Sequence, residues 1–254
     1  NCTSFNVSGG LTLVDGSRLV LNNPFCTGSI SFTTTAPQSV LGNGEIVLQG
    51  VGTSQAIQST SSSLTFGPGI TLRCPPDAQG HTEFNFGFSS GRSFTIAGLF
   101  SFERPGGTLT FFGQGPFTNT GTVRVTAGSL VLSAPITNVS FSGPSTTLTG
   151  GKWHAVGGKL SLSGSPSVIG PTAEVIIQGG SVNGFTLLRE NQGSLTLSGG
   201  AFNYSLKNRG KLELGPGAVL SSSVITFEPT STLTIAAKGT APGDFPRVQT
   251  ATAV

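Results

Sequence analysis

Charged residues are scarce in this chain of 254 residues. They account for 9% of it, against roughly 25% in an average globular protein. The formal net charge is only +3, and the basic residues form no dense run. Lys207, Arg209 and Lys211 are the closest group, and their alternation is typical of a solvated turn and strand edge rather than of a phosphate site. We therefore expect no nucleic-acid partner.

Carboxylates are too few to suggest a catalytic centre. Asp occurs three times and Glu seven times. Enzymes on right-handed parallel β-helices that act on acidic polysaccharides need clustered carboxylates, or a carboxylate-bound calcium beside an Arg or Lys. The sequence contains no Asp-Asp, Asn-Thr-Asp or Gly-His-Gly element of that kind. We expect no catalytic residue, cofactor or metal site. A polysaccharide lyase or glycoside hydrolase is the alternative, and it requires carboxylates that meet within ~5–10 Å in a groove.

One irregular stretch, residues 74–83, concentrates reactive side chains. It holds Cys74, Asp77, His81 and Glu83. Metal binding is one interpretation of this stretch. We favour a loop that leaves the wall of a β-structure, because loops run over the surface and carry such side chains without a shared role.

Long apolar runs and helical periods are missing as well. No apolar run approaches the ~20 residues that a membrane span needs, and no window of eleven or more residues shows a helical apolar period. The chain starts at Asn1 without a Met, a basic segment or an apolar signal segment, which indicates a processed chain or an excised segment. Its uncharged last residues, 250–254, indicate that the native chain continues or that another subunit covers this end.

Cysteine is also sparse. Cys2 and Cys26 are about one repeat apart, so stacked coils could bring them to disulfide distance, and Cys74 would then be a free thiol or pair outside this segment. The spacing does not match a zinc site. Four Asn-x-Ser/Thr sequons, at Asn1, Asn6, Asn138 and Asn203, are compatible with a secreted eukaryotic glycoprotein.

Short apolar-x-apolar triplets flanked by Gly, Ser and Thr recur along the whole chain. They include Leu11-Thr12-Leu13, Leu64-Thr65-Phe66, Leu109-Thr110-Phe111, Leu160-Ser161-Leu162, Leu195-Thr196-Leu197, Leu212-Glu213-Leu214 and Leu233-Thr234-Ile235. A period of two predicts short strands with one buried face and one solvated face. The single Trp153 and the Phe-rich segments around residues 84–102 are expected to fill the core.

The spacing of the triplets favours a particular β-fold. The leucines at 109, 130, 160, 195, 212 and 233 are separated by 21, 30, 35, 17 and 21 residues. We interpret 35 as two steps of 17 and 30 as one step enlarged by an insertion. Such a period predicts a right-handed parallel β-solenoid of roughly a dozen coils. Gly pairs such as Gly9-Gly10, Gly179-Gly180 and Gly199-Gly200 would supply positive φ at its corners.

The predicted rod has two parts. Residues 106–254 contain the regular coils, and residues 1–105 form a less regular N-terminal part that includes the loop at 74–83. From about Thr108 onward the chain resembles the degenerate β-solenoid repeats of very large autotransporter-like and adhesin-like surface proteins. The resemblance is carried by residues 118–130, 148–153, 193–200 and 207–214. In such repeats Asn residues at coil corners adopt a left-handed backbone and stack, which the resemblance implies for Asn119, Asn191 and Asn208.

Together these features predict an extracellular or cell-surface structural protein. We expect a rigid β-helix rod, part of a filament or adhesin, that self-associates end to end or laterally, or that binds a cell-surface or matrix component. Ice binding or another ligand-binding solenoid is a further alternative. Thr-x-Thr ranks such as Thr232-Leu233-Thr234 do not recur at a constant step, and three Asp cannot supply calcium-binding nonapeptide repeats.

Overall fold

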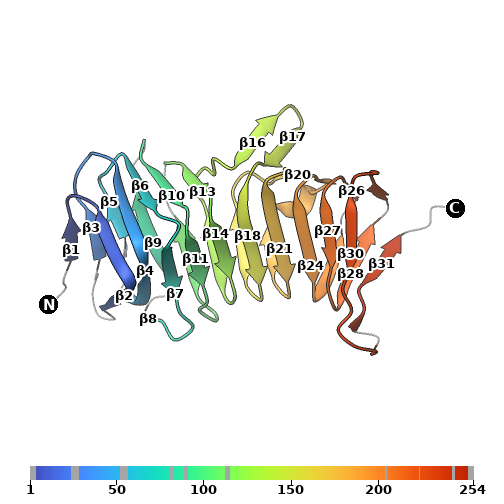
Figure 1. Cartoon of the computed structure of the whole chain (residues 1–254), viewed down its shortest axis with the longest axis horizontal. Helices are drawn as coiled ribbons and strands as arrows, with labels where there is room; N and C mark the ends of the chain where they lie inside the picture. The colour runs from blue at the N-terminus through green and yellow to red at the C-terminus, as the bar shows by residue number, and fades with distance from the viewer. Residues whose placement is uncertain are drawn as a thin grey trace. The chain divides into compact units, whose positions relative to one another are not determined.

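The computed structural model of the chain (Figure 1) describes residues 4–23, 29–51, 57–80, 83–88, 91–111, 115–203, 205–222, 224–241 and 244–250. These residues form 31 strands, most of them short, and one turn of 3-10 helix, η1 (Phe185–Leu187). The strands pair mostly in parallel. The predicted all-β class with almost no helix is therefore confirmed. No helix within these ranges is long and apolar enough to cross a membrane.

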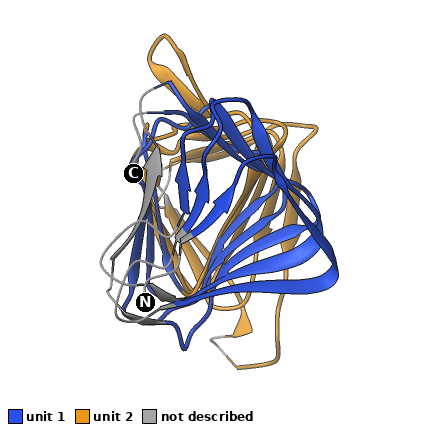
Figure 2. Cartoon of the chain, turned by 90° about the vertical axis from the view of Figure 1, so that its left-hand side faces the viewer, with its two compact units in different colours: residues 1–137, 158–163 blue, residues 138–157, 164–254 orange. Residues whose placement is uncertain are grey.

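The chain divides into two compact units. The first contains residues 1–137 and 158–163, and the second contains residues 138–157 and 164–254 (Figure 2). The sequence predicted a different division, between residues 105 and 106, which is based on the regularity of the repeats and not on compactness. That division stays a prediction.

The first unit contains two sets of parallel strands. In one set, successive partners are β1 (Ser4–Val7), β3 (Ser29–Phe32), β5 (Ile57–Ser59), β9 (Glu83–Phe88), β12 (Thr108–Phe111), β15 (Ser129–Leu132) and β19 (Lys159–Leu162). The other set contains β2 (Leu11–Asn23), β4 (Gln38–Val51), β6 (Ser63–Phe66), β7 (Ile70–Cys74), β8 (Gln79–Gly80), β10 (Ser93–Ile96), β11 (Leu99–Phe102), β13 (Phe117–Asn119) and β14 (Thr122–Val125).

Strand β4 shows how successive stretches of chain lie against each other. Its residues 38–40 pair with β6, residues 44–47 with β7, and residues 50–51 with β8. On its other edge β4 pairs with β2 over most of its length. Three consecutive short strands thus stack, in chain order, on consecutive parts of the preceding long strand.

In the second unit, consecutive strands of the chain are distributed over three sets of parallel strands. One sheet contains β18 (Gly151–Val156), β21 (Ala173–Gln178), β24 (Ser194–Ser198), β27 (Lys211–Leu214) and β30 (Thr232–Ile235). The next contains β17 (Ser145–Leu148), β20 (Val168–Ile169), β23 (Glu190–Asn191), β26 (Leu206–Asn208) and β29 (Ile225–Phe227). The third contains β25 (Gly200–Asn203), β28 (Ala218–Ser222) and β31 (Arg247–Thr250). Strand β22 (Ser181–Asn183) also belongs to this unit.

Consecutive strands in the second unit pair one to one with the strands one repeat later. Strands β23, β24 and β25 pair with β26, β27 and β28, which in turn pair with β29, β30 and β31. Each of three successive repeats therefore contributes one strand to each of the three sheets, in the same order along the chain.

The enlarged step between Leu130 and Leu160 contains an additional strand. Strand β16 (Val139–Ser142) pairs antiparallel with β17, unlike the other strand pairs that the structure describes, and the two project as a hairpin (Figure 1). Arg189 Nη2 donates a hydrogen bond of 2.9 Å to the Pro144 carbonyl at its tip. The predicted insertion in this step is confirmed.

The apolar members of most triplets form the core. Leu64 and Phe66, Leu195 and Leu197, and the members of four other triplets point inward; Leu11 alone among these is half-buried. Leu109 pairs with Leu130, Leu130 with Leu160, and Leu195 with Leu212, as their spacing predicted. The predicted alternation of buried and solvated positions is confirmed for these strands.

One spacing was interpreted wrongly. Leu160 lies in β19 of the first unit, whereas Leu195 lies in β24 of the second, and its partner one repeat earlier is Val175. The 35 residues between the two leucines are therefore not two steps of one column. Because each repeat places similar triplets on different sheets, spacing alone does not identify which sheet a triplet joins.

The last triplet is not buried. Leu233 and Ile235 are 40% and 60% exposed, although they lie in register with the buried Leu212 and Leu214. Strand β30 pairs with β27 on one edge, and no described strand pairs with the other. The expectation of a core position failed here because burial in a stacked sheet requires neighbours on both sides.

Aromatic side chains pack together inside the first unit. Phe94 lies 5.2, 5.3 and 5.8 Å, between ring centres, from Phe66, Phe111 and Phe117. In the second unit Trp153 is fully buried, and its Nε1 donates a hydrogen bond of 2.9 Å to the Gly150 carbonyl. The predicted core roles of Trp153 and of Phe94, Phe100 and Phe102 are confirmed.

Glycine permits the turns after several strands. Gly10, Gly179 and Gly199 have φ of 83°, 61° and 63°, a region that residues with a Cβ rarely adopt. The positive φ predicted for these three Gly pairs is confirmed.

Candidate functional site

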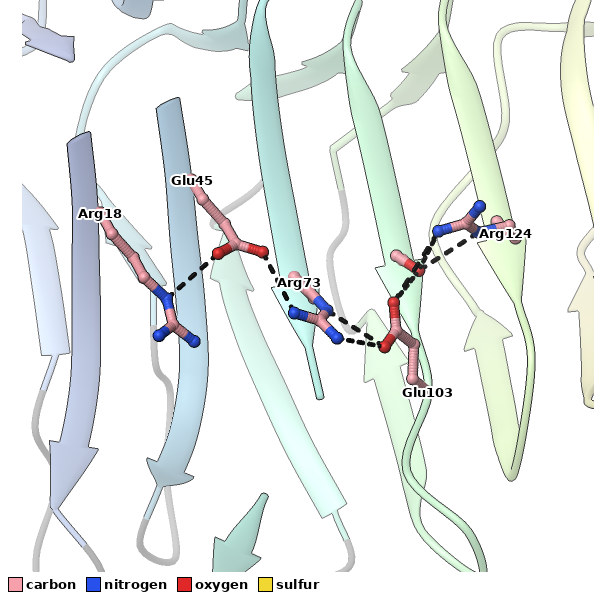
Figure 3. A network of polar contacts seen from close by, with 6 residues as sticks. Arg18, Glu45, Arg73, Glu103 and Arg124 are labelled. Carbon is pink, nitrogen blue, oxygen red and sulfur yellow. Dashed lines mark hydrogen bonds and ion pairs between the residues drawn. The ribbon is translucent and has the colours of Figure 1, made fainter. Parts of the chain in front are cut away.

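The charged side chains of the first unit form a row across its strands. Arg18 of β2, Glu45 of β4, Arg73 of β7, Glu103 directly after β11, and Arg124 of β14 alternate in sign (Figure 3). We call these five residues the arginine–glutamate row. Parallel pairing places Arg18 opposite Glu45, and Arg73 and Arg124 on either side of Ser101. The in-register pairing of outward-facing positions therefore brings together residues up to 106 positions apart.

Glu103 has the most contacts in this row. Arg73 Nε and Nη2 donate to Glu103 Oε2 at 3.0 and 2.8 Å, and Ser101 Oγ donates to Glu103 Oε1 at 2.7 Å. Arg124 Nη2 lies 3.8 Å from the same Oε1. Arg73 Nη1 also lies 3.6 Å from Glu45 Oε1, and Arg18 Nε lies 3.1 Å from Glu45 Oε2. Each carboxylate thus lies between two guanidinium groups.

This environment keeps Glu103 ionised. Burial alone would raise the pKa of its carboxyl, but hydrogen bonds from Arg73 and Ser101 and the charges of Arg73 and Arg124 outweigh it, so the pKa lies below its ordinary value. The hydrogen bond to Glu103 likewise raises the pKa of Arg73. A general acid requires a raised carboxyl pKa instead. The carboxylates of Glu45 and Glu103 both contact Arg73. Their ion pairs fit a structural role better than general acid catalysis. The enzyme alternative stays a prediction.

Ion pairing extends to the second unit. Glu174 contacts Lys152 and His154, Glu190 contacts Arg209, Glu213 contacts Lys211, and Glu228 contacts Lys207. Every Glu whose side chain the structure describes therefore has a cationic neighbour. The Lys207, Arg209 and Lys211 side chains are about half exposed and lie in such pairs, as expected for a solvated edge.

A shallow depression lies at the Arg18 end of the row. It has a volume of about 350 Å³ and is lined by the polar residues Ser17, Arg18, Asn43, Glu45 and Thr71, together with three glycines. Asn43 Nδ2 donates a hydrogen bond of 2.8 Å to Asp15 Oδ1 beside it. Ser17 Oγ is buried and has no hydrogen-bond partner. The depression thus combines hydrogen-bond donors and acceptors with little net charge.

Two of the three glycines of this depression cannot carry side chains without a change in the backbone. A Cβ on Gly44 would lie 2.7 Å from the Ser17 carbonyl oxygen, and one on Gly69 would collide with Asn43 Oδ1 and the Gly42 carbonyl. The close approach of β2, β4 and the turn before β7 therefore depends on glycine at these two positions.

A second outward-facing row of the first unit carries hydroxyl groups. Ser39, Thr65, Thr95 and Thr118 lie side by side on β4, β6, β10 and β13, and Thr118 Oγ1 is 2.7 Å from Thr137 Oγ1. We call these five residues the hydroxyl row. They are separated by 26, 30, 23 and 19 positions in the chain. Sequence reasoning missed the row because these steps are unequal, although the in-register strand pairing aligns the hydroxyls.

Asparagine stacking is confirmed for one pair. Asn191 and Asn208 are buried in register, and Asn191 Nδ2 donates to Asn208 Oδ1 at 2.7 Å and to the Lys211 carbonyl at 2.9 Å. Asn119 is also buried, and its Oδ1 accepts a bond of 3.1 Å from the Gly121 amide. The left-handed backbone implied for these three residues is wrong. Among the described residues other than glycine, positive φ occurs at Ser165.

The remaining predicted site residues are dispersed. Cys2, Cys26, Asn1 and His81 lie outside the described residues, and so does the Glu83 side chain. Asn6 and Asn203 are exposed, whereas Asn138 is buried. Cys74 is a buried free thiol whose pKa burial raises to about 12. Within the part of the chain that the structure describes, no three metal-ligating side chains gather.

Comparisons of the chain with protein-family models, with curated proteins and with solved structures give no match. The resemblance to adhesin-like solenoid repeats thus stays a prediction.

Proposed function

We propose that the chain is a segment of an extracellular structural or adhesive protein, built as a right-handed parallel β-solenoid rod. Two features support the solenoid. Strands β6, β7 and β8 stack in chain order on β4, and three successive repeats of the second unit pair strand by strand in three sheets. This is the pairing pattern of coils that lie directly on one another.

The uncovered edge of the second unit is the observation that supports self-association. Leu233 and Ile235 of β30, Phe227 of β29 and Val248 of β31 are all exposed. Their register partners Leu212, Leu214, Asn208 and Leu220 are all fully buried. Three neighbouring sheets thus end on strands whose partners one repeat earlier are core.

In this proposal, a second copy of the chain covers the uncovered edge of the second unit. Edge strands with free backbone groups pair readily with other strands, and only a coil-built partner presents several parallel edges together. In the first unit, β1 and β2 each pair with one described strand, so this chain itself presents such edges. Head-to-tail contact of this kind is heterologous and produces filaments.

Sedimentation at increasing protein concentration tests this proposal. The wild-type chain should show growing assemblies, and the Leu233→Ser/Ile235→Ser variant should remain a monomer. Leu41→Ser is the matched control, because Leu41 is also exposed but lies on β4 of the first unit. A wild-type chain that stays monomeric, or an unchanged double variant, would contradict self-association through this edge.

The hydroxyl row favours a second candidate function, which we propose as ice binding. Adjacent parallel strands are ~4.8 Å apart, so the row presents hydroxyls at a spacing close to that of oxygen rows in ice. Strands β6, β10 and β13 carry no charged side chain that would hydrate strongly. An ice-recrystallisation assay should show inhibition that Thr95→Lys abolishes and Thr196→Lys preserves. Wild-type protein without inhibition would refute this function.

A further inference from the structure

The depression beside Arg18 has unused hydrogen-bonding groups. Arg18 is 50% exposed and faces Glu45 through Nε, and Figure 3 shows both terminal nitrogens turned away from that carboxylate. These two nitrogens make no hydrogen bond within the described residues. Two donor groups of Arg18 are therefore available beside Glu45 and Thr71, which line the same depression.

The charge of the depression selects the chemistry of its ligand. Arg18 and Glu45 compensate each other, and Asn43 binds the nearby Asp15. An isolated anion would gain little from an arginine that already contacts a carboxylate, and a cation would compete with Arg18 itself. A neutral group that both donates and accepts hydrogen bonds fits better, because a guanidinium edge lies beside carboxylate and hydroxyl oxygens.

We infer that this depression binds a neutral sugar unit through a vicinal diol. Each hydroxyl of a diol can accept a bond from the Arg18 fork and donate one to Glu45 or Thr71. The volume of about 350 Å³ lies at the small end of ligand pockets, which suits one sugar ring. Because no aromatic side chain lines the depression, the affinity of one site should be weak, in the millimolar range.

This inference rests on the adhesive part of the proposed function. A weak sugar site becomes effective when rods assemble, because several linked sites raise the avidity without new contacts. The chain would then contact a glycan-coated surface through its first unit. Its self-association would use the uncovered edge of the second unit and the β1 and β2 edges of a neighbouring copy's first unit.

An NMR titration tests the site directly. The probes are the methyl glycosides of glucose, galactose and mannose, with glucuronate as the anionic comparison. At least one neutral glycoside should shift the amide signals of Gly16, Gly44 and Gly69, which line the depression. No saturable shift with any neutral probe, binding of glucuronate alone, or shifts confined to other residues would each overturn the inference.

Three variants check the assignment. Arg18→Ala should weaken binding about tenfold, because it removes a charged bidentate donor. Arg124→Ala is the matched control: it removes a 40%-exposed guanidinium from the opposite end of the arginine–glutamate row, and it should leave binding unchanged. If Arg18→Ala fails to fold, Thr71→Val should weaken binding by removing a hydroxyl at the same place. If the Arg18→Ala variant binds the sugar as tightly as the wild type, the assignment is overturned. Where Arg18→Ala does not fold, wild-type affinity in Thr71→Val overturns it in the same way.

Sedimentation of the same samples separates the two proposals. Sugar binding by a chain that never assembles would refute self-association and leave the sugar site standing. Assembly without sugar binding would refute the sugar site and leave self-association standing.

Discussion

Individual polar residues of this chain are held by partners one repeat away. The stacked pair Asn191 and Asn208 is the clearest case. Its neighbours in register are Ile169 on one side and Phe227 on the other, so the stack has two members. Asn191 Oδ1 is consequently buried without a donor, because the preceding position is an isoleucine. A longer asparagine ladder would satisfy this oxygen.

The asparagine pair predicts strong coupling between two substitutions. Asn191→Leu and Asn208→Leu should each lower the free energy of unfolding by about 1–3 kcal/mol, because each leaves a buried polar partner unpaired. The double variant should lose at least about 1 kcal/mol less than the sum, because it removes both polar groups. Denaturant unfolding measures these values, with exposed Asn183→Leu as the control. Strict additivity would show that the pair does not interact.

Glu103 predicts a pH-dependent stability. Because its folded pKa is lowered, its stabilising contribution is complete above its ordinary pKa and is lost as the pH falls through the folded value, below about pH 4. Glu103→Gln should cost about 1–2 kcal/mol near neutral pH, since Arg73 and Arg124 are partly exposed. It should also flatten the acid dependence of the unfolding free energy. An equally steep acid dependence in the variant would contradict the assignment.

Cys74 predicts slow thiol chemistry. Burial raises its pKa to about 12, so almost no thiolate exists at neutral pH. Iodoacetamide should label the Cys74 peptide rapidly in denaturant and hardly at all in the folded protein. Peptide mapping by mass spectrometry separates this thiol from the other two cysteines. Rapid labelling of the folded protein would show that β7 ends in an accessible position.

At the scale of strands, the sequence determined local structure better than pairing. The period of two in Leu195-Thr196-Leu197 and its equivalents correctly predicted strand type and the buried face, because alternation is a local property of extended chain. Assignment of Leu160 and Leu195 to one column failed, because several sheets carry similar triplets. The hydroxyl row escaped detection for a related reason, since loops of unequal length separate strands that pair in register.

The candidate site was less accessible to sequence reasoning than the fold. Arg18, Glu45 and Thr71 show no motif, and only the stacking of β2, β4 and β7 brings them together. The stacking of Asn191 and Asn208 was predictable, because they occupy equivalent positions 17 residues apart in regular repeats. Equal spacing therefore made a contact predictable, and unequal spacing did not.

Two leucines in one column predict different costs of truncation. Leu212→Ala should lower the unfolding free energy of the monomer by about 2–5 kcal/mol, the range for a buried leucine. Leu233→Ala should cost less than about 1 kcal/mol, because Leu233 is 40% exposed although it pairs with Leu212. Thermal or denaturant unfolding at a concentration below assembly measures both. Equal costs would mean that a further strand covers β30 in the monomer.

At the scale of the whole molecule, the proposed solenoid requires coils that stack on every side. Strands β23, β24 and β25 contribute one repeat, and β26, β27 and β28 contribute the next. A proposed solenoid requires all three pairings at once, whereas an ordinary parallel sheet requires only one. The proposed structural function assigns the arginine–glutamate row to the stability of the first unit and the uncovered edge to self-association.

Cysteine cross-linking between these two repeats is the most direct test. Three double variants place one outward pair on each sheet: Glu190→Cys with Lys207→Cys, Thr196→Cys with Glu213→Cys, and Ala201→Cys with Val219→Cys. Residues in register on adjacent strands lie within disulfide reach. The proposed solenoid predicts an intramolecular disulfide in all three variants, mapped by mass spectrometry. Cross-links on one sheet with none on the other two would contradict it.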